Sequence, residues 1–307
     1  MSRRRLKSDD RMGKDAAPVP LSAHLPDERK PNHLPKGISR REILGAGIAA
    51  GAALSAGGLA GWYYVASRDN PVKDLEKFAL KTHGGHRLRM NDGEKTNQLS
   101  DYELFFSLCF GEGFNLKQAL EVQRKVFPGE KTLIIADVGG ADGSAAADLD
   151  SISGVRAFVI DPDPSIPTKE WGLSRNRFIV RKIEETGLPD DTFHFLVSFD
   201  TLHFTNVPVA FSEIYRLLKP GGVALTDYHF WHRPEGLSNL KAVPIKENVK
   251  VVLPNATLLG QNVISLPVFL KAIDIEREHL GEDFEKHFAM IDPTFVISKP
   301  LEDGVKK

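Results

Sequence analysis

Short apolar runs and helix-like stretches alternate along the second half of the chain. The apolar runs are rich in β-branched and aliphatic residues and predict strands at 132–138, 155–160, 177–183, 193–199, 223–228, 249–253 and 294–298. Helices are predicted from about Ser144 and from Val207 to Leu218, the second being stopped by Lys219-Pro220-Gly221-Gly222. Strands that alternate with helices are typical of an α/β fold built on a parallel sheet.

The region before the first strand has a different pattern. Residues 72–130 predict mainly helices, with amphipathic stretches at 101–110 and 116–126. The single cysteine, Cys109, lies in an apolar run and is predicted to be a core residue rather than a nucleophile. No repeat of 20–50 residues is visible, which excludes a solenoid. We therefore expect one globular domain over residues 70–307.

An uncharged segment of 23 residues, Ile43–Val65, precedes the globular part. As a helix it would be roughly 34 Å long, enough to cross a bilayer core of about 30 Å. Its Trp62-Tyr63-Tyr64 end is suited to the membrane–water interface, which favours an uncleaved anchor. The alternative is an export signal, because residues 39–44 resemble a twin-arginine motif and Val65-Ala66-Ser67 is a tolerable cleavage site. Glycines spaced four apart within 47–61 would allow two such helices to pair, in a homodimer or with a protein partner.

Charge is unevenly distributed, although the formal net charge is only −1. Residues 1–42 carry 11 Lys and Arg against 6 Asp and Glu, contain five prolines, and are predicted to be a disordered basic tail. Such a tail would keep the N-terminus in the cytoplasm and place the globular part across the membrane. The remaining chain is mildly acidic, which argues against a nucleic-acid-binding surface.

A glycine-rich turn joins the first predicted strand to its helix. Residues 137–144 read Asp-Val-Gly-Gly-Ala-Asp-Gly-Ser, with Gly139, Ala141 and Gly143 at every second position. Glycines at such a turn let the backbone approach a ligand closely. Asp161 ends the next strand, where a carboxylate is well placed to accept hydrogen bonds from ribose hydroxyls.

Four blocks of sequence follow one another in order: 137–143, 159–161, 188–193 and 213–222. Together they resemble the S-adenosylmethionine-dependent methyltransferases of the Rossmann-like class, in the broad group called type 11. The resemblance covers roughly residues 130–230, and residues 295–300 look like the last strand of that fold. It implies a central, mostly parallel sheet of seven strands with an antiparallel last strand, flanked by helices.

The resemblance also implies where S-adenosyl-L-methionine would bind. Asp137, Gly139, Ala141 and Gly143 would line the methionine end, and Asp161 would hold the ribose. Where the family often has an acidic residue beside the adenine, this chain reads Lys182-Ile183-Glu184, so Glu184 is expected in that role.

The segment after the fourth predicted strand supplies the candidate catalytic residues. Family members place substrate-facing residues here, and this chain reads Asp200-Thr201-Leu202-His203. Asp200 and His203 are therefore predicted to contact the acceptor or to take its proton. The alternative interpretation is that His203 only caps the edge of the sheet. No metal site is predicted, because the histidine pairs His83/His86 and His229/His232 lack carboxylate partners at helical spacing.

Two functions remain open from the sequence. The first is methyl transfer to an unidentified small-molecule acceptor by a membrane-anchored enzyme. The second is a catalytically inactive binding or scaffold subunit of a membrane-associated complex that keeps the same fold. The reason for the second is a conflict of compartments. S-adenosyl-L-methionine is a cytosolic cofactor, whereas the charges of the tail place the globular domain on the far side of a membrane.

Overall fold

The computed structural model describes residues 70–83, 89–91, 95, 97–111, 113–167, 172–229, 236–253, 263–281, 284 and 293–301. All of them belong to one compact unit of the chain, Ser39–Lys307. The basic tail (1–42) and the apolar segment (43–65) of the sequence analysis lie outside the described residues. Among the helices within those ranges, none has both the length and the apolar character needed to cross a membrane.

The centre of the fold is an eight-stranded sheet with the strand order β5-β3-β2-β6-β7-β10-β8-β9. Its strands are β2 (Leu133–Val138), β3 (Val155–Ile160), β5 (Phe178–Ile179), β6 (Phe193–Ser198), β7 (Leu218–Asp227), β8 (Val249–Val252), β9 (Val263–Ser265) and β10 (Thr294–Ser298). Neighbouring strands from β5 to β7 are parallel, whereas β10 is antiparallel to both β7 and β8. This is the Rossmann-like methyltransferase sheet, with the antiparallel last strand where it was predicted.

The predicted number of seven strands is corrected to eight within the described chain. The additional strand, β9, pairs antiparallel with β8 at the edge of the sheet. Its three residues are too few for an apolar pattern to separate them from the helix that follows.

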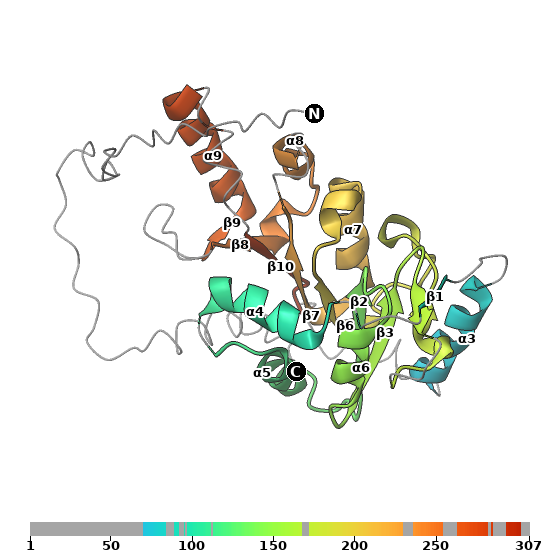
Figure 1. The fold of residues 1–307 in the computed structure, drawn as a ribbon. Helices are drawn as coiled ribbons and strands as arrows, with labels where there is room; N and C mark the ends of the chain where they lie inside the picture. The colour runs from blue at the N-terminus through green and yellow to red at the C-terminus, as the bar shows by residue number, and fades with distance from the viewer. Residues whose placement is uncertain are drawn as a thin grey trace, which may run out of the picture. The chain divides into compact units, whose positions relative to one another are not determined.

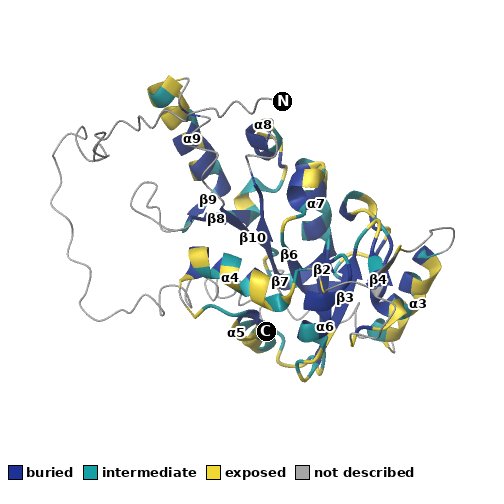
Figure 2. Cartoon of the chain, in the orientation of Figure 1, coloured by how far each residue is buried: buried dark blue, intermediate teal, exposed yellow. Residues whose placement is uncertain are grey.

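Helices cover both faces of the sheet (Figure 1). One face packs against α4 (Leu99–Phe110), α5 (Leu116–Val126) and α6 (Ser144–Asp150). The other packs against α3 (Pro71–Thr82), α7 (Val207–Leu217), α8 (Gly236–Lys241) and α9 (Leu266–Leu280). Because both faces are covered, the inner strands are buried along their length, as the dark strands of Figure 2 show. Burial on two faces explains why these strands read as continuous apolar runs.

Two predicted strands have other bounds in the structure. The run 177–183 contains only the two residues of β5, flanked by the short 3₁₀ helices Arg175–Arg177 and Ile183–Glu185. Conversely, β7 begins at Leu218, so the Lys-Pro-Gly-Gly block predicted as a helix stop is also the start of a strand. This block carries a register shift between β6 and β7, and Gly221 lies in the left-handed region with φ +88°. A second, two-stranded parallel sheet joins β1 (Arg89–Asn91) to β4 (Ser165–Pro167).

Candidate functional site

The carboxyl ends of β2, β3, β6 and β7 lie at one edge of the sheet, and the glycine-rich turn follows β2 at that edge. Gly139 and Gly143 have φ of +76° and +77°, which only glycine adopts without cost. A Cβ on Gly139 would lie 2.0 Å from Oγ1 of Thr201, and one on Gly143 would lie 2.8 Å from Cζ of Phe178. Side chains are therefore excluded at both positions by neighbouring side chains, from the loop after β6 and from β5, as well as by the backbone.

Asp161 is hydrogen-bonded to the same turn. One carboxylate oxygen accepts the backbone N–H of Ala141 at 3.1 Å, and the other accepts that of Asp163 at 2.8 Å. Burial raises the pKa of Asp161 above its ordinary value. Since each oxygen of a carboxylate can accept two hydrogen bonds, each retains one lone pair for a ligand hydroxyl. The structure thus brings Ala141 and Asp161 together, and their contacts with the cofactor stay a prediction.

Asp137 is closed off by a residue that the sequence analysis did not consider. Its carboxylate is buried and accepts the hydroxyl of Tyr102, from α4, at 2.9 and 3.2 Å from its two oxygens. Burial raises the pKa of Asp137 to about 7, although the hydrogen bond from Tyr102 opposes the shift. In this conformation the carboxylate of Asp137 is occupied by Tyr102, and this hydrogen bond joins α4 to the end of β2.

Glu184 lies in the 3₁₀ helix after β5 and is partly buried. Its carboxylate accepts the backbone N–H of Asn206 at 3.1 Å, which is the residue that precedes α7. The structure therefore gives Glu184 a role in joining two loops of the same sheet edge, and its predicted contact with adenine stays a prediction.

The two predicted catalytic residues lie close together. Asp200 follows β6 with φ +55°, and its half-exposed carboxylate has Oδ1 3.7 Å from Nε2 of His203. That separation exceeds hydrogen-bond distance. His203 is fully buried in a short 3₁₀ helix, with its ring centroid 4.0 Å from that of Phe204. Proximity of the pair is thus as expected, while their catalytic roles stay a prediction.

Two further residues complete this cluster at the end of β7. The buried carboxylate of Asp227 accepts the backbone N–H of Asp200 at 3.0 and 2.9 Å. Nε2 of His229 lies 3.0 Å from Oδ2 of Asp227 and 3.5 Å from Oδ1 of Asp200. Burial raises the pKa of Asp227, and the hydrogen bonds from His229 and Asp200 oppose that shift. The sequence predicted no role for Asp227, and His229 was considered there only in the pair His229/His232, which was rejected as a metal site.

Aromatic rings from α4 and from the loop after β6 form one wall beside these groups. The ring of Phe199 lies 5.1 Å from Tyr102 and 5.2 Å from Phe105, measured between centroids. Phe105 in turn meets His229 edge-on at 5.9 Å. The polar cluster therefore borders an apolar surface, an arrangement typical of small-molecule sites. No group of three or more His, Cys, Asp or Glu side chains suited to a metal ion occurs among the described residues.

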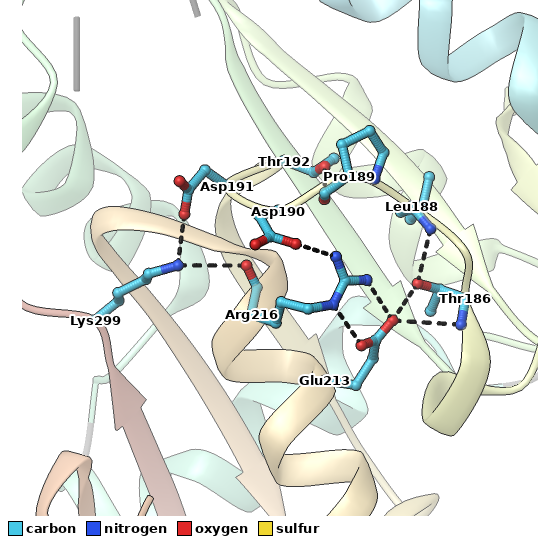
Figure 3. A network of polar contacts seen from close by, with 9 residues as sticks. All are labelled: Thr186, Leu188, Pro189, Asp190, Asp191, Thr192, Glu213, Arg216 and Lys299. Atoms are coloured by element: carbon cyan, nitrogen blue, oxygen red, sulfur yellow. Dashed lines mark hydrogen bonds and ion pairs between the residues drawn. The ribbon is translucent and has the colours of Figure 1, made fainter. Parts of the chain in front are cut away.

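Two of the four sequence blocks that carry the family resemblance, 188–193 and 213–222, contribute to a network of polar contacts (Figure 3) where β6 and β7 begin, which is opposite to the carboxyl ends of these strands. Arg216 in α7 donates to Glu213 and to Asp190, while Glu213 accepts the hydroxyl of Thr186. Lys299, just after β10, donates to Asp191 and to the carbonyl of Arg216. Because these loops precede β6 and follow α7, this network braces the fold and does not contact the candidate site.

One protein-family model matches the central part of this fold. Residues 136–226, from β2 to the end of β7, match the model described as a methyltransferase domain. This part of the chain is therefore similar to a methyltransferase domain. Such a domain uses S-adenosyl-L-methionine, and the turn at Gly139–Gly143 together with the remaining lone pairs of Asp161 fits that cofactor.

Solved structures with similarity to the chain include several proteins. Phosphoethanolamine N-methyltransferase 2 of Haemonchus contortus is 17% identical over 74% of this chain and 60% of its own, with a TM-score of 0.36. The chain thus spans 60% of the length of that protein. Geranyl diphosphate C-methyltransferase of Streptomyces coelicolor A3(2) is 14% identical over 76% of this chain and 99% of its own, with a TM-score of 0.35. The [4+2]-cyclase SpnF is 15% identical over 74% and 93%, with a TM-score of 0.35. A search of curated proteins found no match to the chain.

Proposed function

We propose that the chain transfers a methyl group from S-adenosyl-L-methionine to a small-molecule acceptor. The observation that supports this most directly is Asp161, whose carboxylate is hydrogen-bonded to the glycine-rich turn of the methyltransferase domain. Its remaining lone pairs would accept the ribose hydroxyls, and the glycines would let the cofactor approach the backbone. When bound, the cofactor supplies a methyl group on a positively charged sulfur.

The residues after β6 and β7 would handle the acceptor. Asp200 and His203 lie at the sheet edge where the methyl group would point, so they remain our candidates for acceptor contact. The wall of Phe105 and Phe199 would exclude water and orient the acceptor. Holding the acceptor in a reactive orientation lowers the entropic part of the activation barrier.

Binding of S-adenosylhomocysteine tests the site without knowledge of the acceptor. We expect the full chain to bind this product in isothermal titration, and Asp161→Ala to weaken binding by about 1–3 kcal/mol through loss of buried hydrogen bonds. Asp163→Ala is the matched control. Asp163 lies in the same loop as Asp161, and the substitution removes an exposed carboxylate that pairs with Arg89. Equal affinity of wild type and Asp161→Ala would show that the ribose site is assigned wrongly.

Absence of binding to both the cofactor and its product would favour the second function. The chain would then be a catalytically inactive scaffold or binding subunit that retains the fold. Tyr102 is the residue to examine first in that case, because its hydroxyl already occupies both oxygens of Asp137.

We also propose that Ile43–Val65 anchors the protein as a single-pass membrane helix with its N-terminus in the cytoplasm. Its support is the run of 23 uncharged residues behind a basic tail. Washing membranes with high salt and with carbonate should leave the chain in the membrane fraction, because burial of an apolar helix is insensitive to charge screening. Release of the intact chain would exclude the anchor, and a soluble product starting near residue 68 would support export of the twin-arginine type.

A further inference from the structure

A hydrogen bond between two buried side chains joins the glycine-rich turn to α4. The hydroxyl of Tyr102 donates to the carboxyl group of Asp137, at 2.9 and 3.2 Å from its two oxygens. Both residues are buried, so separating them without other partners would leave two polar groups unsatisfied away from water. Helix α4 and the end of β2 are therefore held together by a directed contact as well as by apolar packing.

The same carboxyl group lies against the backbone of the turn. A Cβ on Gly140 would lie 2.5 Å from Oδ2 of Asp137, so only glycine lets the turn approach this closely. The next residue, Ala141, has φ +43°, in the left-handed region, and its N–H is held by Asp161 at 3.1 Å. Such a conformation persists where surrounding contacts hold it. The turn is thus held by Asp137 and by the predicted ribose residue Asp161.

The ring of Tyr102 belongs to the aromatic wall that would orient the acceptor. Its centroid lies 5.1 Å from that of Phe199, which in turn lies 5.2 Å from that of Phe105. Aromatic rings at these separations attract one another in preferred geometries. Tyr102 and Phe105 are on the same helix, one turn apart, so a displacement of α4 moves both rings. The hydrogen bond of Tyr102 therefore fixes the wall relative to the glycine-rich turn.

We propose that Tyr102 is a positioning residue for the acceptor, because its hydrogen bond to Asp137 couples the aromatic wall to the occupancy of the cofactor site. This inference rests on the proposed function. Contacts form a continuous path from Asp161, where the ribose would bind, through the turn and Asp137 to Tyr102. A cofactor that binds Asp161 and lies against the turn would stiffen this path, and α4 with it. The acceptor would then meet an ordered wall only after the cofactor is bound.

Hydrogen–deuterium exchange of the full chain, measured by mass spectrometry with and without S-adenosylhomocysteine, follows the turn and α4 separately. In the wild type we expect the product to slow amide exchange in the turn, and in α4 by roughly fivefold or more, the lower end of typical coupling between sites. Tyr102→Phe keeps the ring and removes the hydroxyl, so the turn should still respond to the product whereas α4 should not. Tyr215→Phe is the matched control, since it removes a hydroxyl from α7 on the other face of the sheet and should keep both responses.

The possible results distinguish the coupling from the cofactor site itself. A response of the turn without a response of α4 in the wild type would overturn the inference, as would an equal response of α4 in Tyr102→Phe. Asp137→Asn gives a second test if Tyr102→Phe does not fold. Its side-chain carbonyl still accepts from Tyr102, so the response of α4 should remain, and its loss would also contradict the inference. If the turn does not respond and isothermal titration shows no binding, the proposed function itself fails, and the inference fails with it.

Discussion

Replacement of Asp137 by asparagine should make the protein more stable at neutral and alkaline pH. The carboxyl group is buried at the end of β2, with the hydroxyl of Tyr102 as its donor, and its pKa is raised from 3.8 to about 7. The native state therefore holds a proton that the unfolded chain releases near its ordinary pKa. As pH rises from about 4 to about 7, the free energy of unfolding falls, and above the native pKa the loss is complete.

The size of this effect follows from the pKa difference. About three units at roughly 1.4 kcal/mol each amount to about 4 kcal/mol between the two ends of this pH range. Asp137→Asn removes the titration while keeping a carbonyl that accepts from Tyr102. The variant should thus gain stability relative to wild type as pH rises, by up to about 4 kcal/mol at pH 8 compared with pH 4.

Urea unfolding followed by far-ultraviolet circular dichroism, at one-unit steps from pH 4 to pH 8, measures this difference. Asp148→Asn on α6 is a suitable control, because it changes net charge equally without touching the buried carboxyl. A stability difference between Asp137→Asn and wild type that is constant across the range would refute the reasoning. The same outcome would show that Asp137 keeps an ordinary carboxylate in the folded protein.

Three other changes have defined outcomes. Gly139→Val should abolish binding of S-adenosylhomocysteine and lower the melting temperature, because its Cβ would overlap Thr201; calorimetry measures both. Glu130→Gln should reduce stability at pH 7 and lose that effect toward pH 2, since hydrogen bonds from His194 and Lys219 lower the pKa of Glu130 to about 2; acid-unfolding curves test it. His203→Ala, if His203 takes the proton, should lower turnover roughly 10²–10⁴-fold with cofactor affinity unchanged, whereas parallel losses of melting temperature and affinity would indicate a packing role.

The parts of the fold that the sequence predicted well are those buried on two faces. Strand β3 and helix α5 have the predicted bounds, because covered parallel strands and amphipathic helices leave a clear apolar pattern. The run 177–183 was predicted as one strand but contains only Phe178–Ile179 with β geometry. An apolar pattern reports burial, and burial here comes from α3 and from the 3₁₀ turns as much as from sheet pairing.

For the site, the sequence located the glycine-rich turn, Asp161, and the pair Asp200 and His203, since each follows directly on a strand end. It missed Tyr102 because that residue lies 35 positions before Asp137 on a separate helix. A tyrosine on the buried side of an apolar helix has no sequence signal that separates a hydrogen bond to a carboxylate from ordinary core packing.

The sequence by itself therefore determined the class of fold, the succession of strands and helices along the chain, and the glycine-rich turn at which a ligand is expected, because hydrophobic periodicity and glycine turns are local properties. Only the tertiary structure decided which polar side chains share that edge. Asp227 contacts Asp200, 27 positions earlier in the chain, and Asp137 acquires a pKa near 7 only when folding buries it. Burial and hydrogen-bond partners come from packing between distant segments, and they set the pKa of a carboxyl group.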